Sequence, residues 1–420
     1  MRSIALLFAS FCALAIAGAE DFQGAGHKLE YEGAPIKYHD QTPEDPVARL
    51  QHRLAAGEAK LEFDERHGYL PSLLEELKIP ASSQSLLFSK TSFQRTFISP
   101  ENPRAIYFND DVYIGYIPGA PAVELSAIDP KLGAVFYKLD NEKVRRPRFV
   151  RDQDCLRCHG EQRTLGVPGT FVRSVGTDES GELDTRTEVS DIDHCTPLAD
   201  RWGGWYVTGT SGPQVHRGNL IGASAFARHQ TEPGFLGNLP DLSQFFDAGK
   251  HLRPTSDIVA LMVLEHQGKM HNYITRLAYD AQLMMHTYGH TRYLTSQVNA
   301  FLRFLLFAEE APLTAPIAGD PAFVTGFTAH AVRDGKGRSL RDLDFQTRMF
   351  KHPCSYLIYA PAFDAMPAVI REHLLQRLHA ILIGKDRDPQ FARLGDADRT
   401  AVLEILRETK PSLPDYWRGS

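Results

Sequence analysis

The chain has 420 residues, of which 43% are hydrophobic and 23% are charged. This is an ordinary globular composition, long enough to bury one large core or two smaller ones. The net charge of −6 argues against nucleic acid as a partner.

The first 19 residues are typical of a secretory signal peptide. Arg2 supplies positive charge, Ile4 to Ile16 form an apolar run, and the small residues 17–19 form a cleavage site before Glu20. The run is too short to cross a bilayer, which needs about 20 apolar residues, and no later run approaches that length. We therefore expect a periplasmic or secreted protein with no membrane span after cleavage, an uncleaved N-terminal anchor being the alternative.

The region that follows is predicted to be an arm and then a β-rich domain. Residues 20–45 are polar and rich in Gly and Pro, which favours a flexible surface arm. Residues 46–231 open with helical patterns at Pro46 to Ala56 and Leu73 to Leu77. Short apolar runs separated by turn formers then indicate an antiparallel sheet. The runs begin at Ala105, Val112, Ala122 and Ala134, with further strand-like runs at 170–175, 202–208 and 220–226.

Beyond a connection around residues 231–254, the hydrophobic period lengthens to that of helices, and residues 255–420 form the predicted helical domain. Ser256 or Asp257 can cap a helix that Gly289 ends. The expected fold class is α+β, with a β-rich, haem-bearing N-terminal half and a mainly α-helical C-terminal half. Four more helices are expected over Thr291 to Ala308, Leu340 to Phe350, Pro367 to Ile383 and Asp398 to Lys410.

The segment CLRCH, residues 155–159, carries the chemistry. C-x-x-C-H is the attachment pattern of c-type haem. Cysteines three apart on a helical turn point the same way, so the Cys155 and Cys158 sulfurs can bond the two vinyl groups of one porphyrin. The next residue, His159, can then ligate the iron as the proximal ligand.

The alternatives to haem attachment at this segment are a zinc half-site, a redox dithiol and an accidental match. A second closely spaced cysteine pair is missing from the sequence, and Arg151, Asp152 and Gln153 precede the first cysteine on an isolated turn rather than a strand. Export also favours haem, because haem is attached to such motifs outside the cytoplasm. The sequence therefore predicts one covalently bound haem c.

Through this pentapeptide and the signal peptide, the sequence resembles c-type cytochromes. Longer phrases resemble those of long secreted single-haem bacterial proteins without an assigned function: RWGGWYVTG from Arg201, GRSLRDLDFQTRMF from Gly337 and PCSYLIY from Pro353. A sheet before C-x-x-C-H is also faintly similar to haem-carrying sensor domains of the PAS type. The resemblance implies a metal-binding, electron-transfer protein of the periplasm.

The second axial iron ligand would decide between mechanisms, because a strong ligand favours electron transfer and an open site favours small-molecule chemistry. The distal candidates are His194, His216, His266 and Met270. The histidines could instead be solvent-facing residues, and the methionine could fill the core. His216 and Arg217 would suit a peroxidase, but neighbours in an extended segment point to opposite faces.

Two further features leave alternatives open. Cys195 and Cys354 either form a disulfide or are two separately buried thiols. Basic residues around the motif either contact the haem propionates, dock an acidic redox partner, or form a solvated face. They are Lys143, Arg145, Arg146, Arg148, Arg151, Arg157 and Arg163.

The sequence therefore favours a haem protein that exchanges electrons with a redox partner protein or a small electron donor or acceptor. The alternatives are a peroxidase-like oxidoreductase with an open distal site and a haem-based sensor or binding module. The chain is long for a simple electron shuttle, which indicates an additional role.

Overall fold

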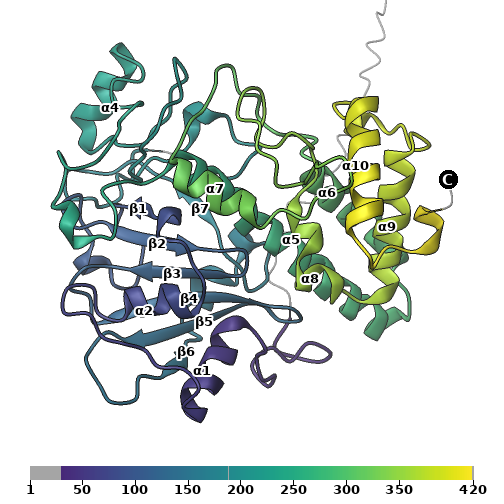
Figure 1. The fold of residues 1–420 in the computed structure, drawn as a ribbon, viewed down its shortest axis with the longest axis horizontal. Helices are drawn as coiled ribbons and strands as arrows, with labels where there is room; N and C mark the ends of the chain where they lie inside the picture. Colours follow the sequence, from purple (N-terminus) through teal and green to yellow (C-terminus); the bar gives the residue numbers. More distant parts are fainter. Residues whose placement is uncertain (1–29, 188, 419–420) are drawn as a thin grey trace, which may run out of the picture.

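The structure, a computed structural model, describes residues 30–187 and 189–418. An antiparallel sheet forms one side of the molecule and a group of helices forms the other (Figure 1). The fold class is therefore α+β, as the sequence predicts. The six strands pair in chain order and are β1 Ser85–Leu87, β2 Arg104–Phe108, β3 Val112–Tyr116, β4 Ala122–Asp129, β5 Gly133–Asp140 and β6 Phe149–Arg151.

The sheet forms where apolar runs alternate with turn residues. The turn between β4 and β5 shows the local cause: the Asp129 carboxylate accepts hydrogen bonds from the backbone N–H groups of Lys131 and Leu132, at 2.8 and 2.9 Å. Gly133 follows at φ 71°, a backbone conformation that glycine adopts without strain. The four runs predicted to start at 105, 112, 122 and 134 are thus confirmed as β2 to β5.

A long central helix, α5 (Ile258–Tyr288), joins the sheet side to the other helices. The Asp257 carboxylate accepts from the Ala260 N–H at 2.8 Å at its start, and Gly289 ends it at φ 72°. Most of α5 is buried against β5, β7 and α6. Buried apolar residues from Tyr31 to Trp417 form one continuous cluster, so the two halves of the chain share a core.

The remaining elements lie around α5 and around the sheet (Figure 1). A separate two-stranded sheet consists of β7 Val172–Ser174 and β8 Ser190–Ile192. Among the helices of the described residues, none combines the length and the apolar character that crossing a membrane requires. The other helices are α1 Pro46–Ala56, α2 Leu70–Glu76, α3 Leu156–His159, α4 Gly222–Thr231, α6 Thr295–Leu305, α7 Pro321–Ala329, α8 Pro361–Asp364, α9 Ala368–Leu382 and α10 Asp396–Thr409.

Three local predictions are corrected. The run 220–226 enters helix α4, and 202–208 is an irregular segment with isolated β-bridges rather than a strand. The predicted helix from Leu340 to Phe350 is a turn-rich segment in which the Asp344 N–H donates to the Met349 carbonyl at 2.9 Å. Here the N–H donates to a carbonyl five positions later in the chain, whereas in a helix it donates to a carbonyl four positions earlier.

The described part of the predicted arm is packed rather than loose. Tyr31 and Tyr38 are buried, and the Tyr38 hydroxyl donates to the Ala134 carbonyl on β5 at 2.7 Å. Aromatic side chains, which bury large apolar areas, hold this Gly- and Pro-containing segment against the sheet. The predicted signal peptide, residues 1–19, lies outside the described residues.

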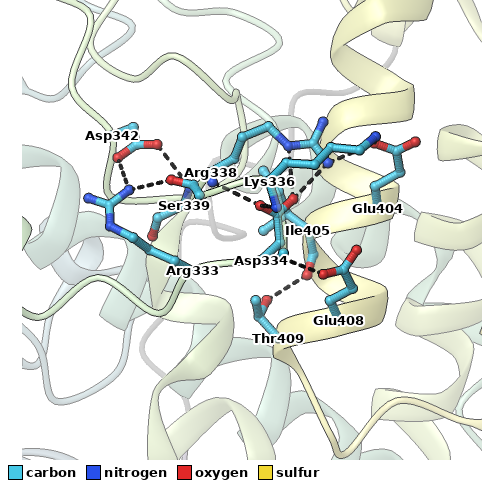
Figure 2. Close-up of polar contacts among 12 residues, drawn as sticks. Arg333, Asp334, Lys336, Arg338, Ser339, Asp342, Glu404, Ile405, Glu408 and Thr409 are labelled. Atoms are coloured by element: carbon cyan, nitrogen blue, oxygen red, sulfur yellow. Dashed lines mark hydrogen bonds and ion pairs between the residues drawn. The ribbon is translucent and has the colours of Figure 1, made fainter.

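An ion-pair network fastens the loop 333–342 to α10 (Figure 2). Glu404 of α10 accepts from Lys336 at 2.8 Å and from Arg338 at 2.7 Å. Glu408, one helical turn later, accepts from the backbone N–H of Gly335 at 2.6 Å. The buried carboxylate of Asp334 shapes the loop from within by accepting two of its N–H groups. The loop is therefore held by its own turn and by the helix.

Candidate functional site

The C-x-x-C-H segment forms a single helical turn, α3, shortly after β6. The expectation that Arg151 precedes the motif on an isolated turn is therefore wrong, because Arg151 is the last residue of β6. The Cys158 and His159 N–H groups both donate to the Cys155 carbonyl, at 3.2 and 2.9 Å. Cys155 is half-buried beside Asp152, whereas Cys158 is exposed and lines a cavity. The two thiols therefore lie three positions apart on one turn, and of the two only Cys158 lines the cavity.

The imidazole of His159 is fixed by packing and by one hydrogen bond. Its ring packs against Phe136 and Phe171, at centroid distances of 5.1 and 4.8 Å. Its Nδ1 lies 2.9 Å from the Gly169 carbonyl, so Nδ1 carries the proton and donates. Burial lowers the pKa of His159 to about 4. At neutral pH the ring is therefore uncharged, and its Nε2 keeps a free lone pair.

Helix α5 holds the Gly169 carbonyl in place. Asn272 of α5 accepts from the Thr170 N–H at 3.0 Å and donates to the Thr170 carbonyl at 2.7 Å. A Cβ at Gly169 would lie 2.1 Å from the Asn272 side chain, so this close approach requires glycine. The orientation of His159 thus depends on contacts from the other half of the chain.

A cavity of about 930 Å³ opens beside His159. Its wall comes from the C-x-x-C-H turn, from β7 and β8, and from helices α5 and α6. Phe171 and Phe304 provide aromatic surface, and Tyr273 of α5 packs against Phe304 with its ring tilted, at a centroid distance of 4.9 Å. The volume lies within the roughly 300–1,000 Å³ that is usual for cofactor pockets, but the wall is more polar and more charged than the usual, mostly apolar kind.

The charged residues of the wall fall into paired and unpaired groups. Arg163 binds Asp191 at 2.6 Å, and Arg303 lies 3.3 Å from Glu309. Two wall cations, Arg173 and Lys269, make no ion pair with any described residue. The complete charged wall is Arg157, Glu161, Arg163, Arg173, Asp191, Asp193, Lys269, Arg303 and Glu309.

These residues fit the haem that the motif implies. A metal-binding histidine usually donates its second ring N–H to a carbonyl, which fixes the tautomer, and His159 does so. Cys158 and His159 both line the cavity, and Cys155 is on the same turn. Cys155 and Cys158 would hold the porphyrin covalently and His159 would ligate the iron.

The four distal candidates lie outside the cavity wall. His194 and His266, 72 residues apart, contact each other through their Nδ1 atoms at 2.9 Å, and His266 Nε2 lies 2.8 Å from the Ser355 hydroxyl. His216 uses both ring nitrogens, one with the Gly237 carbonyl and one with the Gly218 N–H, each at 3.0 Å. Met270 is buried in the core.

The four described cysteines are free thiols, so Cys195 and Cys354 are separate rather than joined as a disulfide. Cys195 lies in the cavity wall, whereas Cys354 is buried next to Ser355. His194 and Ser355, the sequence neighbours of Cys195 and Cys354, are linked through hydrogen bonds to His266. Five of the seven basic residues singled out in the sequence lie outside the wall, and Arg157 and Arg163 line it.

The sequence interpretation missed Phe171, Arg173 and Lys269. Phe171 and Arg173 could have been found from the sequence. They are two positions apart on an extended segment shortly after the motif, and side chains at that spacing point to the same face of a strand. Lys269 had no comparable signal, since only the packing of α5 brings it to the cavity. In the described part of the chain, no group of three or more His, Cys, Asp or Glu residues has a metal-binding arrangement.

No protein-family model matches this chain, and neither a curated protein nor a solved structure matches it significantly.

Proposed function

We propose that this protein is an exported c-type haem protein that transfers electrons in the bacterial periplasm. The observation that carries the proposal is the His159 imidazole, whose Nδ1 is bonded to the Gly169 carbonyl. His159 lines a large cavity together with Cys158, and Cys155 is on the same turn. This arrangement leaves Nε2 for the iron. A haem bound here would supply a one-electron centre that cycles between its ferric and ferrous states.

Different residues of the chain would anchor such a haem and orient its iron ligand. Cys155 and Cys158 would anchor it, so that the cofactor stays bound in both oxidation states. Phe136 and Phe171 both pack against the His159 ring, and these contacts limit its rotation. A ligand that keeps its orientation on oxidation and reduction suits electron transfer, because little reorganisation accompanies the reaction.

The test is covalent haem retention after denaturation, measured by haem stain on a denaturing gel. The wild type is expected to stain, and the double variant Cys155→Ala/Cys158→Ala is expected not to. Cys195→Ala is the matched control, because that thiol lies in the same cavity wall but outside the motif. Stain that persists in the double variant, or is absent from exported wild type, would contradict the proposal.

A second candidate is a haem enzyme, such as a peroxidase-like oxidoreductase, with an open distal side. The observation that favours it is the composition of the cavity wall. Among the described residues that line the cavity, His159 is the only histidine and none is a methionine. An absorption spectrum with and without carbon monoxide separates the two candidates. A low-spin spectrum that carbon monoxide leaves unchanged supports the electron carrier, and a high-spin ferric spectrum with ready carbon monoxide binding supports the enzyme.

A further inference from the structure

The β7 segment and helix α5, which pack against each other, each contribute an aromatic residue and a cation to the cavity wall. Phe171 and Arg173 are two residues apart on the extended segment that includes β7, so their side chains share one side. Lys269 and Tyr273 are four apart on α5, so they share one helix face. Both pairs line the cavity beside His159.

The two cations stand out because the nearby carboxylates are engaged elsewhere. Asp191 is the backbone partner of Arg173 in the β7–β8 ladder, yet its carboxylate binds Arg163 at 2.6 Å. Asp193 accepts from the backbone N–H of Cys195 at 2.8 Å, which closes its own turn. Glu309 lies 3.3 Å from Arg303. Arg173 and Lys269 therefore have no ion-pair partner among the described residues.

Arg173 is also placed where a bare cation is unfavourable. Its guanidinium lies over the Phe171 ring, 5.6 Å from the ring centre, and this cation–π contact is attractive, but it does not supply a negative charge. Burial and the neighbouring charge of Arg163 lower the pKa of Arg173. An anion in the cavity would relieve both costs, since an arginine fork pairs with a carboxylate through two parallel hydrogen bonds.

We propose that Arg173 and Lys269 form a carboxylate-binding face of this cavity and hold the two propionate groups of the haem. The inference rests on the proposed function, because it takes the carboxylates from the haem bound at Cys155, Cys158 and His159. The propionate partners are therefore not the basic residues nearest the motif in sequence, but two cations that folding brings to the cavity.

The experiment measures the reduction potential of the purified holoprotein as a function of pH. The variants are Arg173→Gln and Lys269→Gln. Each is expected to lower the potential at neutral pH, because a propionate that loses its cation stabilises ferric haem. Each is also expected to raise the propionate pKa by about one to three pH units. The pH at which the reduction potential begins to depend on pH should rise by the same amount.

Two controls separate a lost charge from a damaged fold. Arg173→Lys keeps the charge and is expected to restore most of the wild-type potential. Arg217→Gln removes a half-buried arginine that pairs with Asp200 at 2.6 Å outside the cavity wall, and is expected to leave the potential unchanged. If the glutamine variants fail to fold, the pH dependence of the wild-type potential still tests the proposal. Propionates paired with Arg173 and Lys269 stay ionised, so the potential should be constant between about pH 5 and pH 8.

The outcomes distinguish this inference from the function on which it rests. Wild-type potentials with a propionate transition in that range would overturn it, as would unchanged potentials in both glutamine variants that carry haem. In either case, covalent haem on the gel leaves the proposed function standing. Wild-type protein without covalent haem would overturn both.

Discussion

The side chain of Asn272 on α5 makes two hydrogen bonds with the backbone of Thr170, at 3.0 and 2.7 Å. The neighbouring Gly169 carbonyl accepts the Nδ1 proton of His159 at 2.9 Å. A residue of the helical half, 113 positions after His159 in the numbering, thus sets the orientation of the imidazole through one loop. The site is therefore a product of both halves of the chain.

Replacing Asn272 by Ala is expected to lower the free energy of unfolding by about 1–3 kcal/mol, because two partly buried backbone groups of Thr170 lose their partners. Urea unfolding of the apoprotein measures this. Gln376→Ala, on the exposed face of α9, is the control and should change stability by less than about 0.5 kcal/mol. Equal stabilities of the two variants would contradict the role given to Asn272.

The buried ion pair between Arg201 and Glu265 gives a second prediction. Both side chains are almost fully buried, and Arg201 also donates to the Thr196 and His194 carbonyls, at 2.8 and 3.1 Å. Burial raises the pKa of Glu265 to about 7. Arg201→Met should cost about 3–5 kcal/mol of unfolding free energy, because it leaves a buried carboxyl group without its cation.

The double variant Arg201→Met/Glu265→Leu is expected to recover part of that loss, since it removes the stranded carboxyl group as well. Chemical unfolding of the two single variants and the double variant gives their coupling energy. A double variant as unstable as the sum of the single variants would show that the two side chains do not act as a pair.

The buried histidine His216 predicts a stability that depends on pH. Burial lowers its folded pKa from 6.5 to about 4, so below pH 6.5 the unfolded chain binds a proton that the folded chain does not. The contribution is complete above about pH 6.5 and falls as the pH drops toward 4. At pH 5, His216 alone should cost the wild type about 2 kcal/mol relative to pH 7.5.

His216→Gln is the variant that isolates this contribution. It should be less stable than the wild type at pH 7.5, because two hydrogen bonds at 3.0 Å are disturbed, but the difference should shrink at pH 5. Urea titrations at the two pH values measure both differences. A stability gap of the same size at both values would show that His216 does not titrate as described.

The ionic network on α10 predicts a local rather than a global effect. Glu404→Gln removes the partner of Lys336 and Arg338, both on the loop 333–342 (Figure 2). Partly exposed ion pairs contribute less than about 1 kcal/mol, so global stability should change little. Limited proteolysis of the loop should accelerate, whereas Asp396→Asn on the same helix, which pairs with Arg387, should leave the cleavage rate unchanged.

The fold was predictable from sequence where local signals are complete. Asp257 and Gly289 mark both ends of α5 through capping contacts within a few residues. The segment from Leu340 to Phe350 shows the limit, because its helical periodicity yields to contacts from elsewhere. The Met349 N–H donates to the carboxylate of Glu310 at 2.7 Å, and Phe345 adopts φ 51°.

The same limit applies to the site. Adjacent residues define the C-x-x-C-H turn, so its cysteines and His159 are visible in sequence. Arg173 and Lys269 lie about 100 positions apart in the numbering, and only the packing of α5 against β7 brings both to one cavity. The contact between His194 and His266 is likewise a long-range product of folding.

Covalent attachment of one haem to the CLRCH turn is the central claim, and mass spectrometry of the exported wild-type protein tests it most directly. The account predicts an intact mass raised by one haem and a proteolytic peptide containing Cys155 and Cys158 that carries the added mass. An exported protein whose Cys155 and Cys158 are both found unmodified, in cells that mature other c-type haem proteins, would contradict it.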